Sequence, residues 1–283
     1  MGLKKKIAFI SVALIISLVP LFATGKINGE LKATLTTTEE ITLETGYAVK
    51  MATLRGKEAP FDKNGFKLGG KMAVSPISVV LSFDTALNPI YFVEIGGGAV
   101  LGTGWNFDRL NFKGLAIGDG GSDITHDSLG GLYYNGYGTL TFSFDTKPFF
   151  DNDWLRFSLD VYQEVGYKGY TAQRDGKGWD FNQKGLYRNG LSYKGRYLLT
   201  YKMPIAIDSV GLIFETRYEN IKNSFDVGMV FDLALFANLN FKEHYNLTVK
   251  GQMTTEKIDS ETRKISNGAF GFRKIGVSFG YSF

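Results

Sequence analysis

The chain has 283 residues, of which 44% are hydrophobic, 14% are aromatic and 21% are charged, and its formal net charge is +4. It contains no Cys, which excludes a disulfide framework and a lipoprotein anchored through cysteine. Gly is abundant, Pro is rare, and after the N-terminus the apolar residues recur at every second position rather than in long helical runs. These features favour a single all-β domain.

Residues 1–25 have the pattern of a secretory signal peptide. Three lysines at 4–6 precede an apolar run at 7–19, which ends at Pro20 and is followed by small residues at 23–25. The run is shorter than the roughly 20 residues of a membrane-spanning helix, although an uncleaved anchor is the alternative. Cleavage of residues 1–25 would remove three lysines and leave a net charge of +1, so the basic charge of the whole chain does not indicate a nucleic-acid partner. The predicted domains are therefore a signal peptide at 1–25 and a β-domain at 26–283.

Twelve segments alternate between apolar and polar side chains, as expected for strands with one apolar face. The segments lie at 28–38, 41–54, 64–75, 79–83, 91–101, 132–144, 155–167, 191–201, 210–218, 225–235, 245–253 and 268–283. Many have ten residues or more, whereas strands of soluble proteins have about 5–6. A strand that crosses an outer membrane needs about 9–11 residues, so the lengths favour a membrane barrel.

The connections between these segments fall into two classes. If both termini face the periplasm, short turns are expected on that side and longer loops outside. The predicted periplasmic turns are 55–63, 86–90, 146–153, 203–207 and 240–244, and the predicted outer loops are 38–41, 75–77, 103–129, 170–184, 221–224 and 257–266. The two longest connections, 103–129 and 170–184, fall on the outer side, as this arrangement requires.

The last strand shows the alternation most clearly. Its apolar positions are Ile275, Val277, Phe279, Tyr281 and Phe283, and small or polar residues separate them. This ending resembles the C-terminal signal of bacterial outer-membrane β-barrels, in which the last strand alternates and finishes on Phe. The resemblance implies a transmembrane antiparallel up-and-down β-barrel of about 12 strands, with 10 or 14 as alternatives, in the outer membrane of a diderm bacterium. It also implies that residues 275–283 bind the assembly machinery. A soluble β-protein with an amphipathic closing strand is the other interpretation.

The residues on the opposite face of the strands are charged. A soluble barrel fills its interior with apolar groups, so a charged interior requires the apolar face to lie outside, in lipid. Aromatic residues at the predicted strand ends agree with this, because such rings collect at membrane–water interfaces. The predicted pore-lining residues are Lys50, Glu94, Arg156, Asp160, Glu164, Lys194, Arg196, Glu215, Arg217, Asp226, Asp232, Lys250 and Lys274.

These residues predict an outer-membrane channel for passive or facilitated diffusion of small hydrophilic solutes. Both charge signs occur on neighbouring strands, so strong ion selectivity is not expected. The alternative is that these charge pairs between strands only stabilise the wall of the barrel. Loop 103–129 could fold inward and narrow the pore. The alternative function is a surface-exposed binding protein or adhesin, which uses the barrel as a scaffold for loops 103–129 and 170–184. Trp105 and Trp179 are the loop-binding candidates, although each could instead anchor the loop fold.

Enzymatic chemistry is not predicted. His126 falls in an outer loop and His244 at a periplasmic turn, so the two cannot share a site. The glycines at 96–98 lack the following helix of a nucleotide-binding loop. No metal ligands and no cofactor are expected. The expected partners are outer-membrane lipid, the assembly machinery and small polar solutes, and a homo-oligomer is compatible with the apolar outer face.

Overall fold

The computed structural model describes residues 26–36, 41–53, 64–107, 112–150, 152–173, 176–182, 184–221, 227–241 and 244–282. The predicted signal peptide, Asp226 and Phe283 lie outside these residues. Across the described ranges, no helix is long and apolar enough to cross a membrane.

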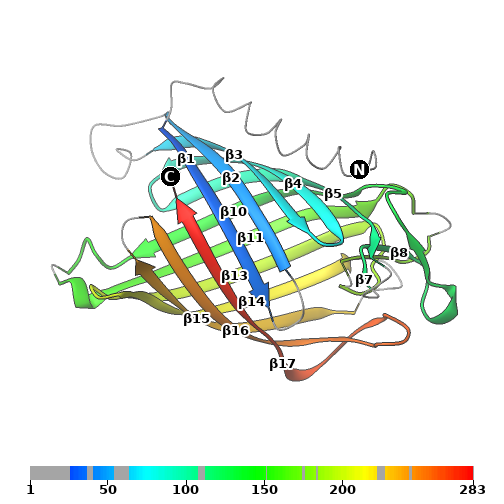
Figure 1. The fold of residues 1–283 in the computed structure, drawn as a ribbon. Coiled ribbons are helices and arrows are strands. Elements are labelled where there is room, and N and C mark those ends of the chain that lie inside the picture. The colour runs from blue at the N-terminus through cyan, green and yellow to red at the C-terminus, as the bar shows by residue number, and fades with distance from the viewer. Residues whose placement is uncertain are drawn as a thin grey trace.

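Twelve of the described strands close into one antiparallel barrel, which confirms the predicted fold and strand number (Figure 1). They range from 11 to 18 residues in length, enough to cross a membrane at a tilt. In chain order they are β1 (Lys26–Thr36), β2 (Ile41–Ala52), β3 (Gly65–Ser75), β4 (Ser78–Ile90), β5 (Val93–Gly104), β10 (Tyr133–Asp145), β11 (Arg156–Tyr170), β13 (Gly190–Lys202), β14 (Ile207–Ile221), β15 (Met229–Phe241), β16 (Tyr245–Ile258) and β17 (Ile265–Ser282). Each barrel strand pairs with the next along the chain, and β1 pairs with β17 to complete the wall.

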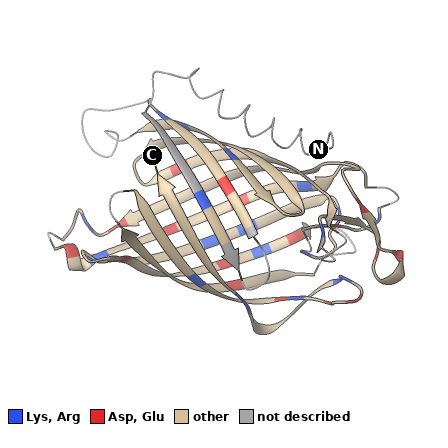
Figure 2. Ribbon diagram, in the orientation of Figure 1, with Lys and Arg blue, Asp and Glu red and all other residues tan. Residues whose placement is uncertain are grey.

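The two faces of the wall have the predicted orientation. Leu159 on β11 and Val277 on β17 are 41% and 42% exposed on the outer surface. Asp232 on β15 is buried inside, and Lys274 on β17 lines an internal cavity. Charged positions of both signs are spread over the barrel strands (Figure 2). In a membrane this arrangement leaves no backbone edge unpaired, and it directs charge to water and apolar groups to lipid.

Several strand boundaries differ from the prediction, and those at β4 and β15 are examples. The expected turn at 86–90 is wrong, because β4 continues to Ile90 and the chain reverses at residues 91–92. The register shifts between Leu87 and Ile90, and such a bulge tolerates Pro89, which has no N–H for the ladder. Strand β15 begins at Met229, later than the predicted segment 225–235. The alternation of apolar residues therefore predicted which side chains share a face of the sheet, but not where these strands begin or end.

The long connections carry their own short strands at one end of the barrel. Strands β6 (Asn106–Phe107), β7 (Phe112–Lys113), β8 (Leu115–Ile117) and β9 (Thr125–Asp127) belong to the β5–β10 connection, and β12 (Trp179–Phe181) belongs to the β11–β13 connection. β12, β8 and β9 pair in that order as a three-stranded sheet, so two separate loops form one structure. We refer to this sheet and the side chains packed on it as the cap.

Candidate functional site

Two cavities inside the barrel are lined by described residues. The first has a volume of about 660 Å³, and the charged side chains that line it include Lys67, Lys71, Asp84 and Glu94. His244, at the turn before β16, also lines it, so this cavity extends towards the end of the barrel opposite the cap. The second has a volume of about 570 Å³ and lies against the cap. The charged residues that line it are Glu164, Lys168, Lys184, Lys194, Glu215, Arg217, Glu219, Asp232, Arg273 and Lys274.

Five side chains form a collar where the two cavities adjoin: Asp84, Tyr137, Tyr162, Glu164 and Arg196. Tyr162 lines the first cavity and Glu164 the second, and the Tyr162 hydroxyl donates a hydrogen bond to Glu164 Oε2 at 2.5 Å. The Arg196 guanidinium lies 4.9 Å from the centre of the Tyr162 ring, which places a cation over an aromatic face. The Tyr137 hydroxyl donates to Asp84 Oδ1. The collar therefore consists of ordered polar groups that face the lumen.

Gly98 on β5 allows Tyr137 to reach Asp84. Tyr137 is on β10 and Asp84 is on β4, so the phenol ring must cross β5, which lies between them. A Cβ at Gly98 would lie 2.6 Å from the Tyr137 hydroxyl oxygen. The absence of a side chain at this strand position thus permits a close approach, as glycine in a strand interior often does.

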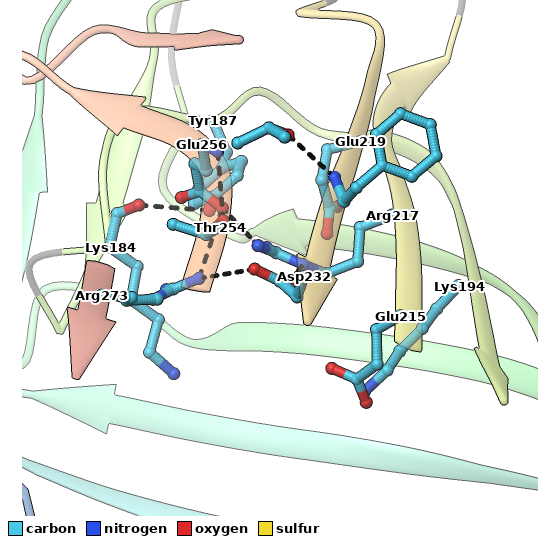
Figure 3. Close-up of polar contacts among 12 residues, drawn as sticks. Lys184, Tyr187, Lys194, Glu215, Arg217, Glu219, Asp232, Thr254, Glu256 and Arg273 are labelled. Carbon is cyan, nitrogen blue, oxygen red and sulfur yellow. Dashed lines mark hydrogen bonds and ion pairs between the residues drawn. The ribbon is translucent and has the colours of Figure 1, made fainter. Parts of the chain in front are cut away.

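A charge network lies on the wall beside the second cavity (Figure 3). Arg217 on β14 donates from Nε to Asp232 Oδ2 at 2.8 Å and from Nη2 to Glu256 Oε2 at 2.5 Å. Arg273 approaches the same two carboxylates at 3.6 and 3.7 Å. Both acidic side chains are almost completely buried, so each depends on its arginine partners to compensate for lost hydration.

Two further ion pairs join neighbouring or nearby strands around the second cavity. Lys194 Nζ lies 3.3 Å from Glu215 Oε1, and Lys168 Nζ lies 2.5 Å from Glu219 Oε1. The predicted alternation of charge between strands is therefore present as contacts on this side of the lumen.

The cap closes over the second cavity through an aromatic core. Trp179 is 2% exposed and packs with Leu115, Tyr170 and Phe181. Phe181 stacks on Tyr133 of the barrel wall, with ring centres 4.9 Å apart and planes 8° apart. Because these rings lie across the capped end of the lumen, the cap narrows this end of the barrel.

Polar contacts hold the cap to a third loop. Arg263, between β16 and β17, donates to Asp180 Oδ2 from Nε at 3.2 Å and from Nη2 at 3.0 Å. The Leu186 N–H donates to the Arg263 carbonyl at 3.0 Å. Burial raises the pKa of the Asp180 carboxyl, and the Arg263 guanidinium opposes that rise. Asp180 and Arg263 therefore form a buried latch.

A more exposed ion pair joins the two loops of the cap. Lys177 Nζ lies 3.0 Å from Asp123 Oδ1. The hydrogen bond from Lys177 lowers the pKa of Asp123. This pair is accessible to water on both partners, so we expect it to contribute less to cap docking than the latch does.

The structure places the predicted lining residues at several levels of the barrel. Glu94 lines the first cavity, and Glu164, Lys194, Glu215, Arg217, Asp232 and Lys274 line the second. Arg196 belongs to the collar. Lys50 on β2 lies directly opposite Lys67 on β3, and Lys250 on β16 is opposite Phe236 on β15.

Two other predicted residues make contacts near the end of the barrel opposite the cap. Arg156 Nη2 lies 3.2 Å from Asp145 Oδ2, and Asp160 Oδ1 accepts from Ser143 Oγ at 2.5 Å. Asp226 is outside the described residues.

The two tryptophan candidates occupy different settings. Trp179 is inside the cap core, and its Nε1 donates to Asn189 Oδ1 at 2.9 Å, so no face of the ring is open to a ligand in this arrangement. The Trp105 Nε1 donates to the Pro76 carbonyl at 2.7 Å and ties the first loop to the β3–β4 turn. Both side chains therefore contribute to the loop structure.

Some residues of the site were missed from the sequence. Tyr137 and Tyr162 share the inward face with the predicted acids, so their alternation could have identified them. Glu256 continues the inward alternation of Lys250 on β16, but it lies beyond the predicted end of that segment at residue 253. Arg273 could not be found by alternation, because the β16–β17 register shifts between Gln252 and Met253 and leaves Arg273 as an extra residue in β17. A bulge moves every later residue to the other face relative to a simple count of twos.

Comparisons with known proteins find likeness in structure but not in sequence. No family model and no curated protein matches the chain. The solved structure of the NanC porin is 9% identical, with a TM-score of 0.45, and the match covers 90% of this chain and 98% of that one. The KdgM porin is 10% identical, with a TM-score of 0.40 and coverage of 90% and 99%. The translocator domain of the autotransporter NalP from Neisseria meningitidis is 9% identical, with a TM-score of 0.43 and coverage of 99% and 96%.

The described strands form a closed antiparallel β-barrel with an apolar outer face. The similar structures include both porins and autotransporter barrels, so they do not select a solute or a transported cargo. Within the described ranges of this barrel, no group of three or more His, Asp or Glu side chains is placed to hold a metal ion.

Proposed function

We propose that this chain is an outer-membrane channel for the diffusion of small hydrophilic solutes, and that the collar and the cap limit the flow. The observation that supports this most directly is the pair of charged cavities in series inside a closed twelve-strand wall. Barrels of about 8 strands are filled by side chains and those of about 16 leave a wide channel, so twelve strands fit a narrow pore.

The chemistry of the lumen indicates the solute class. Lys67, Lys71, Asp84 and Glu94 present both charge signs to the first cavity, and the collar adds tyrosine hydroxyls. Such a surface can exchange hydrogen bonds with a hydroxyl-rich or zwitterionic molecule without requiring one net charge. The proposed solutes are therefore small, polar and not selected by charge alone.

Conductance of the refolded chain in planar bilayers tests this proposal. We expect stepwise currents from the wild type and larger steps from Tyr162→Ala, because the substitution removes the ring between the two cavities. The matched control is Tyr197→Ala, which removes a tyrosine from the outer face and should leave the step size unchanged. A folded wild-type barrel that gives no stepwise current at any voltage would exclude a channel, and equal effects of both substitutions would exclude the collar as its constriction.

The proposal includes the predicted route to the membrane. Residues 1–25 direct export and are removed, and residues 275–283 bind the assembly machinery. N-terminal sequencing of the mature chain checks the first step: a chain that still begins at Met1 would favour an uncleaved anchor.

A further inference from the structure

The β16–β17 hairpin continues past the end of its neighbour β1 at the capped side of the barrel (Figure 1). β1 pairs with Gly276–Ser282 of β17 and ends at Thr36. β17 begins at Ile265, so its outer part has β16 on one side and, among the strands that the structure describes, none on the other. Residues 266–272 are all exposed, so this stretch of strand is accessible at its edge and on its faces.

The backbone of this stretch has hydrogen-bonding groups that the hairpin does not use. In an antiparallel ladder, alternate residues direct their N–H and C=O groups to opposite neighbours, and β1 does not reach residues 266–272. The pairing with β16 is also interrupted, because Thr254 is opposite Gly271 and Glu256 is opposite Asn267, which leaves residues 268–270 as a bulge. A strand edge with unpaired backbone groups can accept a further strand.

Contacts at the tip and at the base hold the hairpin in place. The Asp259 side chain accepts hydrogen bonds from two backbone N–H groups of the turn. Arg263 ties the turn to Asp180 of the cap at 3.0 Å, and Asn267 Nδ2 donates to the Met229 carbonyl of β15 at 2.6 Å. The open edge therefore belongs to an ordered strand, which lowers the entropy cost of binding a partner.

Two basic side chains lie beside the open edge, and neither has an acidic partner within the described ranges. The Lys257 side chain crosses from β16 to β17: a Cβ at Gly268 would lie 2.9 Å from Lys257 Cε and 3.1 Å from Lys257 Nζ. Lys264 is exposed directly before β17. Residues 266–272 contain no Asp, Glu or Pro. Lysines beside an edge oppose pairing with basic segments and favour acidic ones.

We propose that residues 266–272 of β17 bind an extended acidic segment of another protein as an added antiparallel strand, with a carboxylate of that segment on Lys257. The open edge supplies backbone hydrogen bonds, and Phe270, which is 47% exposed, supplies an apolar contact. A second copy in the same membrane does not fit this edge. Antiparallel pairing requires the two strands to run in opposite directions, whereas β17 of every copy runs from the capped end into the wall.

Peptide binding to the full chain, refolded in detergent micelles so that both ends are accessible, tests the proposal. The probe is a fluorescein-labelled peptide of alternating Thr and Val with Asp at its centre, and its fluorescence anisotropy is measured. We expect saturable binding that weakens as salt screens the charges. A matched peptide with Lys in place of Asp should not bind. No binding of the acidic peptide, or equal binding of both peptides, would overturn the proposal.

Methylation of the peptide backbone tests whether the segment binds as a strand. Only one edge of an added strand faces β17, and alternate residues direct their N–H groups to that edge. Of two peptides methylated on the odd-numbered or the even-numbered nitrogens, one should therefore lose binding and the other should keep it. If both bind equally well, the peptide is not held as a strand and the proposal is wrong.

Charge reversal places the site on the hairpin. Lys257→Glu should reduce binding of the acidic peptide and increase binding of the basic one. Lys147→Glu is the matched control, because it makes the same charge change at an exposed position at the other end of the barrel. Equal effects of the two variants would overturn the assignment to β17. Sedimentation of the wild type tests the other occupant: a dimer that Lys257→Glu dissociates would show that a second copy takes the edge. None of these results depends on whether the barrel conducts.

Discussion

Arg217 is a cation partner of two buried carboxylates. Its guanidinium contacts Asp232 and Glu256, and both carboxylates are almost completely buried. Arg273 is farther from each of them, so it cannot replace the direct hydrogen bonds of Arg217. Removal of one partner from a buried ion pair leaves an uncompensated charge, which costs more than the intact pair contributes.

Arg217→Met should therefore lower the unfolding free energy of the barrel by about 3–5 kcal/mol. Arg273→Met is the matched control and should cost clearly less, because its shortest contact with the two carboxylates is 3.6 Å. Urea unfolding in lipid vesicles, followed by tryptophan emission, measures both. Equal midpoints for the two variants would contradict the assignment of Arg217 as the main partner.

At the scale of elements, the cap is the part of the molecule that the sequence predicted least well. The sequence allows loop 103–129 to fold inward, and in the alternative function it gives loops 103–129 and 170–184 as a surface for binding. In the structure, β12 from the second loop pairs with β8 from the first, and Trp179 supplies the core of both. Strands of three residues carry too little alternation to be recognised, and their partners lie in a different loop, so periodicity could not reveal them.

The Asp180–Arg263 latch predicts how the cap responds to substitution. Arg263→Met leaves Asp180 buried without its cation, so the docked cap should be destabilised and the open probability of the pore should rise. Arg188→Met is the control, because the Arg188–Asp119 pair at 3.3 Å is more exposed and such pairs contribute little. Single-channel recording measures both variants. A channel that closes for the same fraction of time in both would show that the latch does not hold the cap.

At the scale of the whole molecule, the barrel follows from the alternation of apolar and polar side chains along each strand. The outward face, the twelve strands and the inward charge were all predicted from alternation, because each strand has lipid on one side and water on the other. Predictions failed where that condition fails: at the bulges in β4 and β17, and in the cap, where neither face meets lipid. The depth and width of the cavities depend on which side chains meet across the lumen, and alternation does not report this.

The charges of the whole lumen predict weak ion selectivity. Basic and acidic residues occur in similar numbers among the described residues that line the two cavities, so the reversal potential in a salt gradient should be close to zero. Lys50 and Lys67 give one level of the lumen a local positive charge, because these two like charges are directly opposite each other on adjacent strands. Replacement of both by Glu should shift the reversal potential towards cations, and no shift would show that permeating ions do not pass this level.

The junction of β1 with β17 has a consequence for how the molecule is made. Thr34 Oγ1 and Ser278 Oγ are 3.1 Å apart in the wall although 244 positions separate them in the chain. Strand β1 cannot pair with β17 before the chain has been synthesised through residue 282. Until then both present bare hydrogen-bonding edges, which can recruit other chains and aggregate. The unpaired edges of β1 and β17 therefore need protection from other chains until the barrel closes, because this contact joins strands that are far apart in the sequence.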